Sequence, residues 1–290
     1  MTIYLNGQYM PIEAAQISVL DRGFIFGDGV YEVIPVYSRR AFRLEEHLQR
    51  LQHSLDEIRL PNPHSMLEWT DIITGLIAAN EPDDQYLYLH ITRGVARRDH
   101  PFPNPPVPPT VFVMSNPLPA PRAELLGVSA VTAVDNRWLR CDIKAISLLP
   151  NVLLRQMAVD AGCAETVLLR AGTSEEPAFL TEGAASNIFV VKNGILLAPP
   201  KGQLMLPGIT YDVILEIAES CGIPYSVRKI PADEVFDADE LLLSSSTREV
   251  MAITHLDGKP VGNGVPGPMF HKIYQLYQEF KINVMRASHE

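Results

Sequence analysis

The chain has 290 residues, 47% of them apolar and 20% charged, which is enough to bury one large core or two ordinary ones and excludes a disordered or collagen-like protein. Its net charge of −10, with no run of basic residues, argues against a nucleic-acid partner. Because it has three widely spaced cysteines and neither a long apolar stretch nor a leader, we expect a soluble, cytoplasmic protein without a disulfide framework, a metal site or a membrane span.

Patterns in the first part of the chain predict a domain of strands and helices over residues 1–115. The dipeptide Asn6-Gly7 tolerates positive φ angles and predicts a hairpin over residues 3–10. Apolar residues spaced three and four apart predict a helix from near Glu45 to Ile58 and a second helix around Trp69–Ile77. Alternating or β-branched runs predict strands over Tyr31–Tyr37, Ala41–Leu44, Tyr86–Thr92 and Thr110–Met114.

Prolines crowd the stretch from Pro101 to Pro121, where they block helices and central strands. We therefore expect a linker over residues 116–121 and a second, larger domain over residues 122–290. In that domain, helices are expected over Asn151–Ala161 and Thr210–Ser220, each closed by a following glycine, and at the C-terminus around Ile273–Phe280. Strands are expected over Val128–Val134, Thr166–Arg170, Ile188–Val191 and Ile195–Ala198.

Three well-known motifs for other chemistries are excluded. A Gly-x-Gly-x-x-Gly pattern at Gly262, Gly264 and Gly267 follows a hairpin turn, so it does not fit a dinucleotide site. The histidines form no His-Glu-x-x-His metal motif, and the chain has no Gly-x-Ser-x-Gly nucleophile turn.

Lys144 stands out among the seven lysines because aliphatic residues surround it in the segment 141–149. Desolvation there would lower the pKa of the amine and favour the neutral nucleophile that a Schiff base requires. A lysine in such a context more often reaches solvent along its aliphatic stem, so the local pattern leaves both interpretations open.

Glu182 is the second candidate, in the run Thr181-Glu182-Gly183-Ala184-Ala185-Ser186-Asn187 at the expected entry to a strand. Small residues after it would let a flat ring approach the backbone, and its carboxylate could hold a pyridinium proton. An ordinary turn carboxylate is the competing interpretation.

Five ordered motifs resolve these alternatives through a resemblance. They are DRGFIFGDGVYEV (21–33), EEHLQRL (45–51), RWLRCDIK (137–144), TEGAASNIF (181–189) and LPGIT (206–210). Together they resemble the class IV, or fold-type IV, pyridoxal-phosphate aminotransferases over nearly the whole chain. The resemblance implies an α+β two-domain fold, with a small N-terminal α/β domain and a larger C-terminal mixed α/β-barrel-like domain. It also implies a homodimer with shared active sites.

The resemblance assigns a role to each candidate residue. Lys144 would form the Schiff base with pyridoxal 5'-phosphate and move the substrate proton, and Glu182 would pair with the ring nitrogen. Leu206 would pack on the ring, and the phosphate would be held by Arg50, Ile209, Thr210, Ser245 and Ser246. A helix N-terminus near Thr210 suits an anion independently of the resemblance, because its free N–H groups point outward.

Substrate choice within the family is expected from the segment Arg93–Pro103. Its Arg98 and His100 resemble the carboxylate trap of the D-amino acid transaminases, completed by Tyr31 and shared across a dimer interface. An arginine fork, an imidazole and a phenol together suit an α-carboxylate. The expected reaction is ping-pong amino transfer between a D-amino acid and a 2-oxo acid such as 2-oxoglutarate or pyruvate.

Some residues depart from the D-specific pattern. Ala145 stands where a serine is usual, Arg97 adds a charge beside the trap, and Arg248 replaces a small residue, so it either widens acceptance of acidic substrates or forms an ion pair outside the pocket. The alternatives are a branched-chain L-amino acid transaminase, an (R)-amine transaminase and an aminodeoxychorismate lyase. A silent scaffold that has kept the fold is the non-enzymatic alternative.

Overall fold

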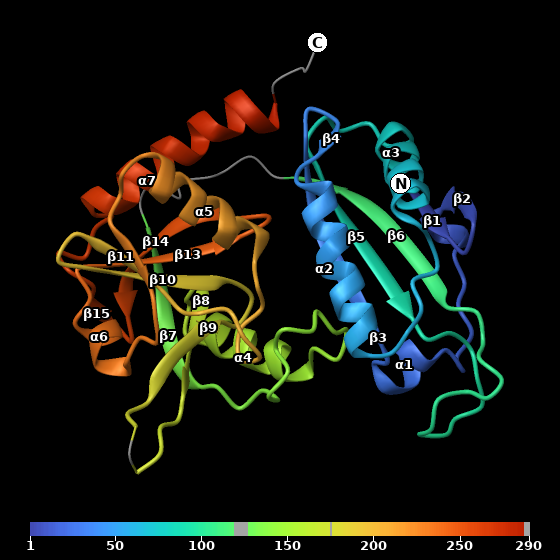
Figure 1. Ribbon diagram of the computed structural model, residues 1–290, viewed down its shortest axis with the longest axis horizontal. Coiled ribbons are helices and arrows are strands. Elements are labelled where there is room, and N and C mark those ends of the chain that lie inside the picture. The colour runs from blue at the N-terminus through green and yellow to red at the C-terminus, as the bar shows by residue number, and fades with distance from the viewer. Residues whose placement is uncertain (119–126, 175, 287–290) are drawn as a thin grey trace. The chain divides into compact units, whose positions relative to one another are not determined.

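The structure, a computed structural model, describes residues 1–118, 127–174 and 176–286 and divides them into two units (Figure 1). The first unit comprises residues 1–118 and the segment Ile143–Leu148, and the second comprises the other described residues. Residues 119–121 of the expected linker, residues 116–121, lie outside the described residues, so the boundaries at 115 and 122 stay a prediction. No pattern in the sequence predicts the return of Ile143–Leu148 to the first unit.

The sheet of the first unit has six strands in the order β2-β1-β6-β5-β3-β4, and all its neighbouring pairs are antiparallel. The predicted hairpin is β1–β2, where Asn6 and Gly7 have φ angles of 46° and 94°. The strands are β1 (Thr2–Leu5), β2 (Gln8–Pro11), β3 (Gly29–Tyr37), β4 (Arg40–Ala41), β5 (Gln85–Thr92) and β6 (Thr110–Pro117).

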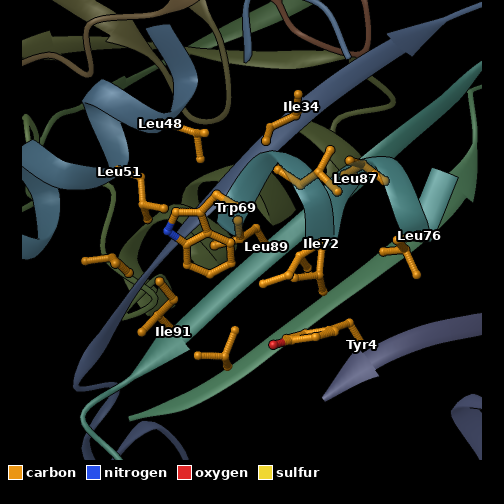
Figure 2. Close-up of a cluster of buried hydrophobic side chains, with 14 of the residues drawn as sticks. Tyr4, Ile34, Leu48, Leu51, Trp69, Ile72, Leu76, Leu87, Leu89 and Ile91 are labelled. Atoms are coloured by element: carbon orange, nitrogen blue, oxygen red, sulfur yellow. The ribbon is translucent and has the colours of Figure 1, made fainter. Parts of the chain in front are cut away.

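Helices α1 (Arg22–Phe26), α2 (Leu44–Glu57) and α3 (Met66–Ala78) and the 3-10 turn η1 (Ile12–Ala14) complete the first unit. Ser65 and Glu68 start α3 with reciprocal hydrogen bonds. The apolar faces of α2 and α3 meet the sheet in a buried core that includes Leu48, Trp69 and Leu89 (Figure 2). The spacings of three and four residues therefore predicted both helices correctly.

The sheet of the second unit follows the order β12-β11-β10-β13-β14-β7-β8-β9, with β15 paired to β14. The pairs β11–β12, β14–β7 and β7–β8 are parallel, and the others are antiparallel. The strands are β7 (Val128–Val134), β8 (Glu165–Arg170), β9 (Phe179–Gly183), β10 (Asn187–Lys192), β11 (Ile195–Ala198), β12 (Tyr225–Val227), β13 (Glu240–Ser245), β14 (Glu249–Leu256) and β15 (Lys259–Pro260).

This second sheet curls. Strand β9 lies at one end of the order, yet only residues 184–186 separate it from β10, which lies near the other end. The Gly183 N–H donates to the carbonyl of Ser186, at 2.7 Å, and closes this turn. The edge strand β9 must therefore return toward β10, which gives the sheet the barrel-like form that the resemblance implies. The two sheets with their helices confirm the expected α+β class.

Helices α4 (Leu149–Asp160), α5 (Ile209–Ser220), α6 (Ala232–Phe236) and α7 (Pro268–Phe280) belong to the second unit, and the π-helical turn η3 (Lys281–Met285) follows α7. The glycines expected to close α4 and α5, Gly162 and Gly222, have φ angles of 66° and 63°. In the part of the chain that the structure describes, no helix is long and apolar enough to cross a membrane, and no cluster of three metal-binding side chains occurs.

Two local predictions are wrong. The run Ala41–Leu44 is a strand only at Ala41, because Arg43 adopts a left-handed φ of 50° that turns the chain into α2. Glu182 lies inside β9 and not at the entry to a strand, since the next strand begins at Asn187.

Candidate active site

Lys144 lies against strand β3 in the first unit. The N–H of Tyr31 donates to the carbonyl of Lys144 at 2.9 Å, and the N–H of Lys144 donates to the Ser54 hydroxyl at 3.1 Å. These bonds fix the lysine backbone from both sides. The side chain is half-buried, and its Nζ lies 4.2 Å from the centroid of the Tyr31 ring. Two of the predicted site residues, Lys144 and Tyr31, are therefore in contact.

Arg50 is held by a carboxylate that the sequence analysis overlooked. Its Nε and Nη2 donate to the two oxygens of Glu32 at 2.8 and 2.7 Å, and His47 Nδ1 lies 2.9 Å from Glu32 Oε2. Burial raises the pKa of Glu32, but Arg50 and His47 lower it to well below its usual range. Burial also lowers the pKa of His47, against the opposing effect of Glu32. Because α2 and β3 supply this cluster, Arg50 is oriented before any ligand binds.

Arg98 and His100 lie on the loop that follows β5, and both side chains are exposed. Both meet the ring of Phe26: the Arg98 guanidinium lies 5.4 Å and the His100 ring 5.5 Å from its centroid. Within the described residues, neither side chain forms a hydrogen bond or an ion pair with Tyr31. One chain therefore brings Arg98 and His100 together but does not complete the expected carboxylate site with Tyr31.

Glu182 is buried in the second unit among three donors. Its Oε1 accepts from Arg137 Nη1 at 2.5 Å, its Oε2 accepts from Asn187 Nδ2 at 3.3 Å, and the Leu206 N–H lies 3.3 and 3.2 Å from the two oxygens. A carboxylate has about four lone-pair positions, so one remains for a further donor. The contact with Leu206 brings a second predicted residue beside Glu182.

Burial raises the pKa of Glu182 to about 7, against the lowering effect of Arg137. Arg137 compensates Glu182 only in part because it also binds Asp135 through its Nε and Nη2, each at 2.9 Å. A cationic N–H placed at the remaining lone pair would favour the ionised carboxylate. The site thus fits a protonated pyridine ring.

The N-terminus of α5 fits an anion. Helix α5 starts at Ile209 and Thr210 and has no side-chain cap at Gly208, so its first N–H groups have no intrahelical partner. A Cβ on Gly208 would overlap Asn187 Oδ1, while Asn187 Nδ2 donates to the Leu206 carbonyl at 3.0 Å. Asn187 therefore joins this helix start to Glu182.

Ser245 and Ser246 directly follow Ser244, the residue of β13 that pairs with Asn187. Asn187 pairs with Ser244 in the antiparallel register of β10 and β13, and Ser245 ends β13. The hydroxyl of Ser244 is buried and has no hydrogen-bond partner among the described residues. Asn187 thus contacts Glu182 and Leu206, and the segments that carry Ile209 and Thr210 and Ser245 and Ser246 adjoin its neighbours Gly208 and Ser244.

Arg137 and Asn187 were missed although both lie inside the motifs quoted above, and their polar character between small or apolar residues was the available signal. Glu32 also lies inside such a motif. Lys281, on η3, is a second buried lysine, and it is paired with Glu249. Burial alone therefore does not single out Lys144, because a carboxylate from another element can neutralise a buried amine.

Arg248 binds groups at the start of strand β8. Its Nη1 donates to the carbonyl of Ala164 at 3.1 Å and lies 3.9 Å from the buried carboxylate of Glu165. Of the two roles considered for Arg248, the structure favours the ion pair. Arg97 is exposed and forms no ion pair within the described chain.

The second unit has a curled mixed sheet with a buried carboxyl beside a helix N-terminus, and the first unit has a half-buried lysine and a buried arginine–carboxylate pair. These features define the class of fold-type IV pyridoxal-phosphate enzymes. The model of the family described as amino-transferase class IV matches residues 29–256. The chain belongs to this family, and it is therefore an enzyme that depends on pyridoxal 5'-phosphate.

Curated relatives align over almost their full length. The chain is 37% identical over 279 residues to a D-alanine aminotransferase of Staphylococcus epidermidis, covering 96% of this chain and 97% of that protein. It is 38% identical over 279 residues to a D-alanine aminotransferase of Bacillus licheniformis, covering 96% of each chain.

Solved structures confirm the fold type. The branched-chain amino acid aminotransferase of Escherichia coli superimposes with a TM-score of 0.87 at 28% identity, covering 96% of this chain and 93% of that chain. The branched-chain aminotransferase of the archaeon Thermoproteus uzoniensis, solved with norvaline, gives a TM-score of 0.85 at 26% identity, covering 97% and 94%. A fold IV-transaminase from Curtobacterium pusillum gives a TM-score of 0.80 at 25% identity, covering 93% and 92%.

Proposed function

We propose that this enzyme is a D-amino acid transaminase that moves an amino group between a D-amino acid and a 2-oxo acid, 2-oxoglutarate or pyruvate, by a ping-pong mechanism. The similarity to two D-alanine aminotransferases at 37% and 38% identity supports this substrate class. The arginine–histidine pair Arg98 and His100, exposed on one loop and able to bind a carboxylate, is the observation that carries it.

In this proposal, Lys144 transfers the substrate proton. The bound cofactor supplies an aldehyde that condenses with amines and a ring that accepts electrons from the substrate carbon. The Lys144 Nζ would take the proton from the substrate Cα, while its position 4.2 Å from the Tyr31 ring centroid restricts where it can deliver that proton. Because one lysine serves one face, the side on which the α-carboxylate is held decides which enantiomer reacts.

The remaining residues hold and tune the cofactor in this proposal. Glu182 would accept the ring N–H at its free lone pair, and Leu206 would pack on the ring. Arg50, the N–H groups of Ile209 and Thr210, and the hydroxyls of Ser245 and Ser246 would bind the phosphate. Two of the N–H groups of Arg50 bind Glu32, and its planar, cationic guanidinium is a group that suits a phosphate.

A homodimer with shared active sites belongs to the same proposal. Helix α4 presents an apolar face formed by Leu149, Val152, Leu153 and Met157, of which Leu149 is 68% and Leu153 61% exposed. Residues at these spacings lie on one side of a helix, and an apolar stripe left in water is typical of an interface. A cytoplasmic location also belongs to the proposal, supported by the free thiols of Cys141, Cys163 and Cys221.

The substrate assignment is tested by adding D-alanine or L-leucine to the purified holoenzyme and following the visible absorption band of the cofactor. We expect D-alanine to convert the band and L-leucine to leave it unchanged. A Lys144→Ala variant serves as the control without transamination. Conversion by L-leucine alone would overturn the D-specific assignment.

A branched-chain L-amino acid transaminase is the second candidate function, because several of the solved structures that superimpose on this chain are branched-chain aminotransferases by name. Their identities of 28% and 26% are lower than those of the D-alanine aminotransferases. The same L-leucine experiment decides between the two. Borohydride reduction of the holoenzyme followed by peptide mapping tests the alternative of a silent scaffold. In such a scaffold Lys144 would stay unmodified.

A further inference from the structure

A buried charge cluster lies at the base of the loop that carries Arg98 and His100. Arg22 is 4% and Arg93 6% exposed, and both bind the carboxylate of Asp28. The distances to Asp28 Oδ2 are 2.8 Å from Arg22 Nε and 2.8 Å from Arg93 Nε. Burial raises the pKa of Asp28, but the hydrogen bonds from Arg93 and Arg22 outweigh this effect and lower it, so the carboxylate stays ionised.

The other N–H groups of Arg22 donate hydrogen bonds to the loop itself. Its Nη1 donates to the carbonyls of Asp99 and Pro101 at 2.6 and 3.3 Å, and its Nη2 donates to the carbonyl of His100 at 3.2 Å. Three consecutive carbonyls thus converge on one guanidinium. This contact fixes the backbone that presents the His100 side chain and the residue after Arg98.

Phe26, one helical turn from Arg22 on α1, contacts the side chains. Its ring lies under the guanidinium groups of Arg22 and Arg98, at 4.8 and 5.4 Å from the centroid, and beside the His100 ring at 5.5 Å. A cation within about 6 Å of an aromatic ring is attracted to its face. Phe26 therefore restrains the side chains of Arg98 and His100, while Arg22 restrains the backbone of the same segment.

Arg93 holds the far side of the same loop. Its guanidinium stacks on Phe102 at 3.7 Å from the ring centroid and donates to the carbonyls of Ile58 and Arg59 at 2.7 and 3.2 Å. Backbone hydrogen bonds hold the start of the loop, where Val95 forms an isolated bridge with Asp21, but no strand follows before β6. The conformation of the loop beyond Ala96 therefore depends strongly on these side-chain contacts, since a loop of this length has many alternatives of similar energy.

We propose that Arg22 and Phe26 are positioning residues that set the specificity of this enzyme for α-carboxylates, by holding Arg98 and His100 in the geometry that binds them, with Asp28 and Arg93 fixing Arg22. The inference rests on the proposed function, in which Arg98 and His100 bind the substrate carboxylate. Neither Arg22 nor Phe26 touches substrate in this proposal.

The test uses the holoenzyme of Arg22→Lys, which keeps the charge but loses the planar fork, and of Phe26→Leu. We expect KM for D-alanine to rise on the order of tenfold or more in both variants, because misplacement by about 1 Å has effects of this size, while kcat changes much less. Cofactor content should match the wild type.

Arg39→Lys is the matched control. Arg39 also donates to consecutive carbonyls, those of Ile77 at 2.7 Å and Ala78 at 3.3 Å, but these lie at the C-terminal end of α3. The same substitution there should leave KM for D-alanine unchanged. An Arg39→Lys variant with an equally raised KM would overturn a specific role for Arg22.

Trypsin provides a readout that does not depend on catalysis, since Arg97 and Arg98 are exposed cleavage sites on the restrained loop. Cleavage there should be faster in Arg22→Lys than in wild type or Arg39→Lys, and unchanged in Phe26→Leu, which keeps the backbone contacts. Equal cleavage rates in all four proteins would overturn the restraint by Arg22.

An Arg98→Ala variant separates the two hypotheses. If it raises KM while Arg22→Lys and Phe26→Leu do not, the positioning role is wrong and the carboxylate site stands. If Arg98→Ala leaves KM unchanged, the proposed carboxylate site is wrong. Should Arg22→Lys fail to fold, the KM of Phe26→Leu decides, because that ring is only half-buried.

Discussion

The guanidinium of Arg137 binds the carboxylates of both Asp135 and Glu182, so it compensates the negative charge of Glu182 only in part. The pKa of Glu182 is raised to about 7 from 4.5 by burial, so between these values the folded state binds more protons than the unfolded state. The free energy of unfolding therefore falls as pH rises through this window. The penalty at pH 8 amounts to at most about 3 kcal/mol, at about 1.36 kcal/mol for each pKa unit.

A Glu182→Gln variant removes this titration. We expect the stability of the cofactor-free variant relative to the wild type to increase from pH 5 to pH 8, as measured by urea unfolding at each pH. Glu219→Gln, on the exposed side of α5, should change little because water covers that side chain. A difference that does not vary with pH would contradict the raised pKa.

Individual residues were predictable where the signal is local. Lys144 could be proposed from its aliphatic neighbours, but its contact with Tyr31 could not, because that contact depends on the return of residues 143–148 to the first unit. The bidentate bond between Arg50 and Glu32 could not be foreseen, because it joins a helix to a strand through tertiary packing. The same holds for Lys281 and Glu249, which are 32 residues apart. The roles of the site residues themselves stay predictions.

Gly208 at the start of α5 illustrates a constraint at the level of elements. Its φ is an ordinary −70°, so close packing and not backbone conformation requires a glycine. We expect Gly208→Ala to lower the stability by about 1 to 3 kcal/mol, because the added methyl group overlaps Asn187 and must displace it. Gly202→Ala, where a Cβ meets open space, is the control in the same thermal unfolding measurement. Equal midpoints for the two variants would contradict this packing constraint.

Helices α2 and α3 were found from the sequence because water covers one side of each, which gives their apolar residues a helical period. The hairpin β1–β2 was found from its turn dipeptide Asn6-Gly7. Strands β13 and β14 are buried almost throughout, so Glu240–Ser245 and Glu249–Leu256 show no alternation to read. Helix α1 escaped prediction because five residues are too few for a helical period.

The apolar face of α4 makes assembly of the whole molecule testable. We expect Leu153→Arg to shift the enzyme from dimer to monomer in sedimentation velocity, because a charge would have to be buried in the interface. Leu67→Arg, on an exposed position of α3, is the control and should leave the dimer intact. A dimer that survives Leu153→Arg would remove α4 from the interface.

At the same scale, the fold class followed from ordered motifs and the alternation of strands and helices. The membership of Ile143–Leu148 in the first unit did not, because six residues flanked on both sides by the second unit have no compositional signature. Its tertiary contacts reveal it: the hydrogen bonds of Tyr31 and Ser54 to Lys144, the bond from the Ile146 N–H to the Gly29 carbonyl, and the packing of Ile143 in the core of the first unit.

This excursion of six residues limits how the enzyme can be dissected. Any fragment that ends before residue 143 lacks Lys144, and any fragment that begins after the first sheet carries Lys144 without the strand β3 against which it is fixed. A chimera that exchanges the first unit with that of a homologue must therefore exchange two separate segments, residues 143–148 as well as the N-terminal part of the chain. Otherwise Lys144 packs against a strand from the other protein.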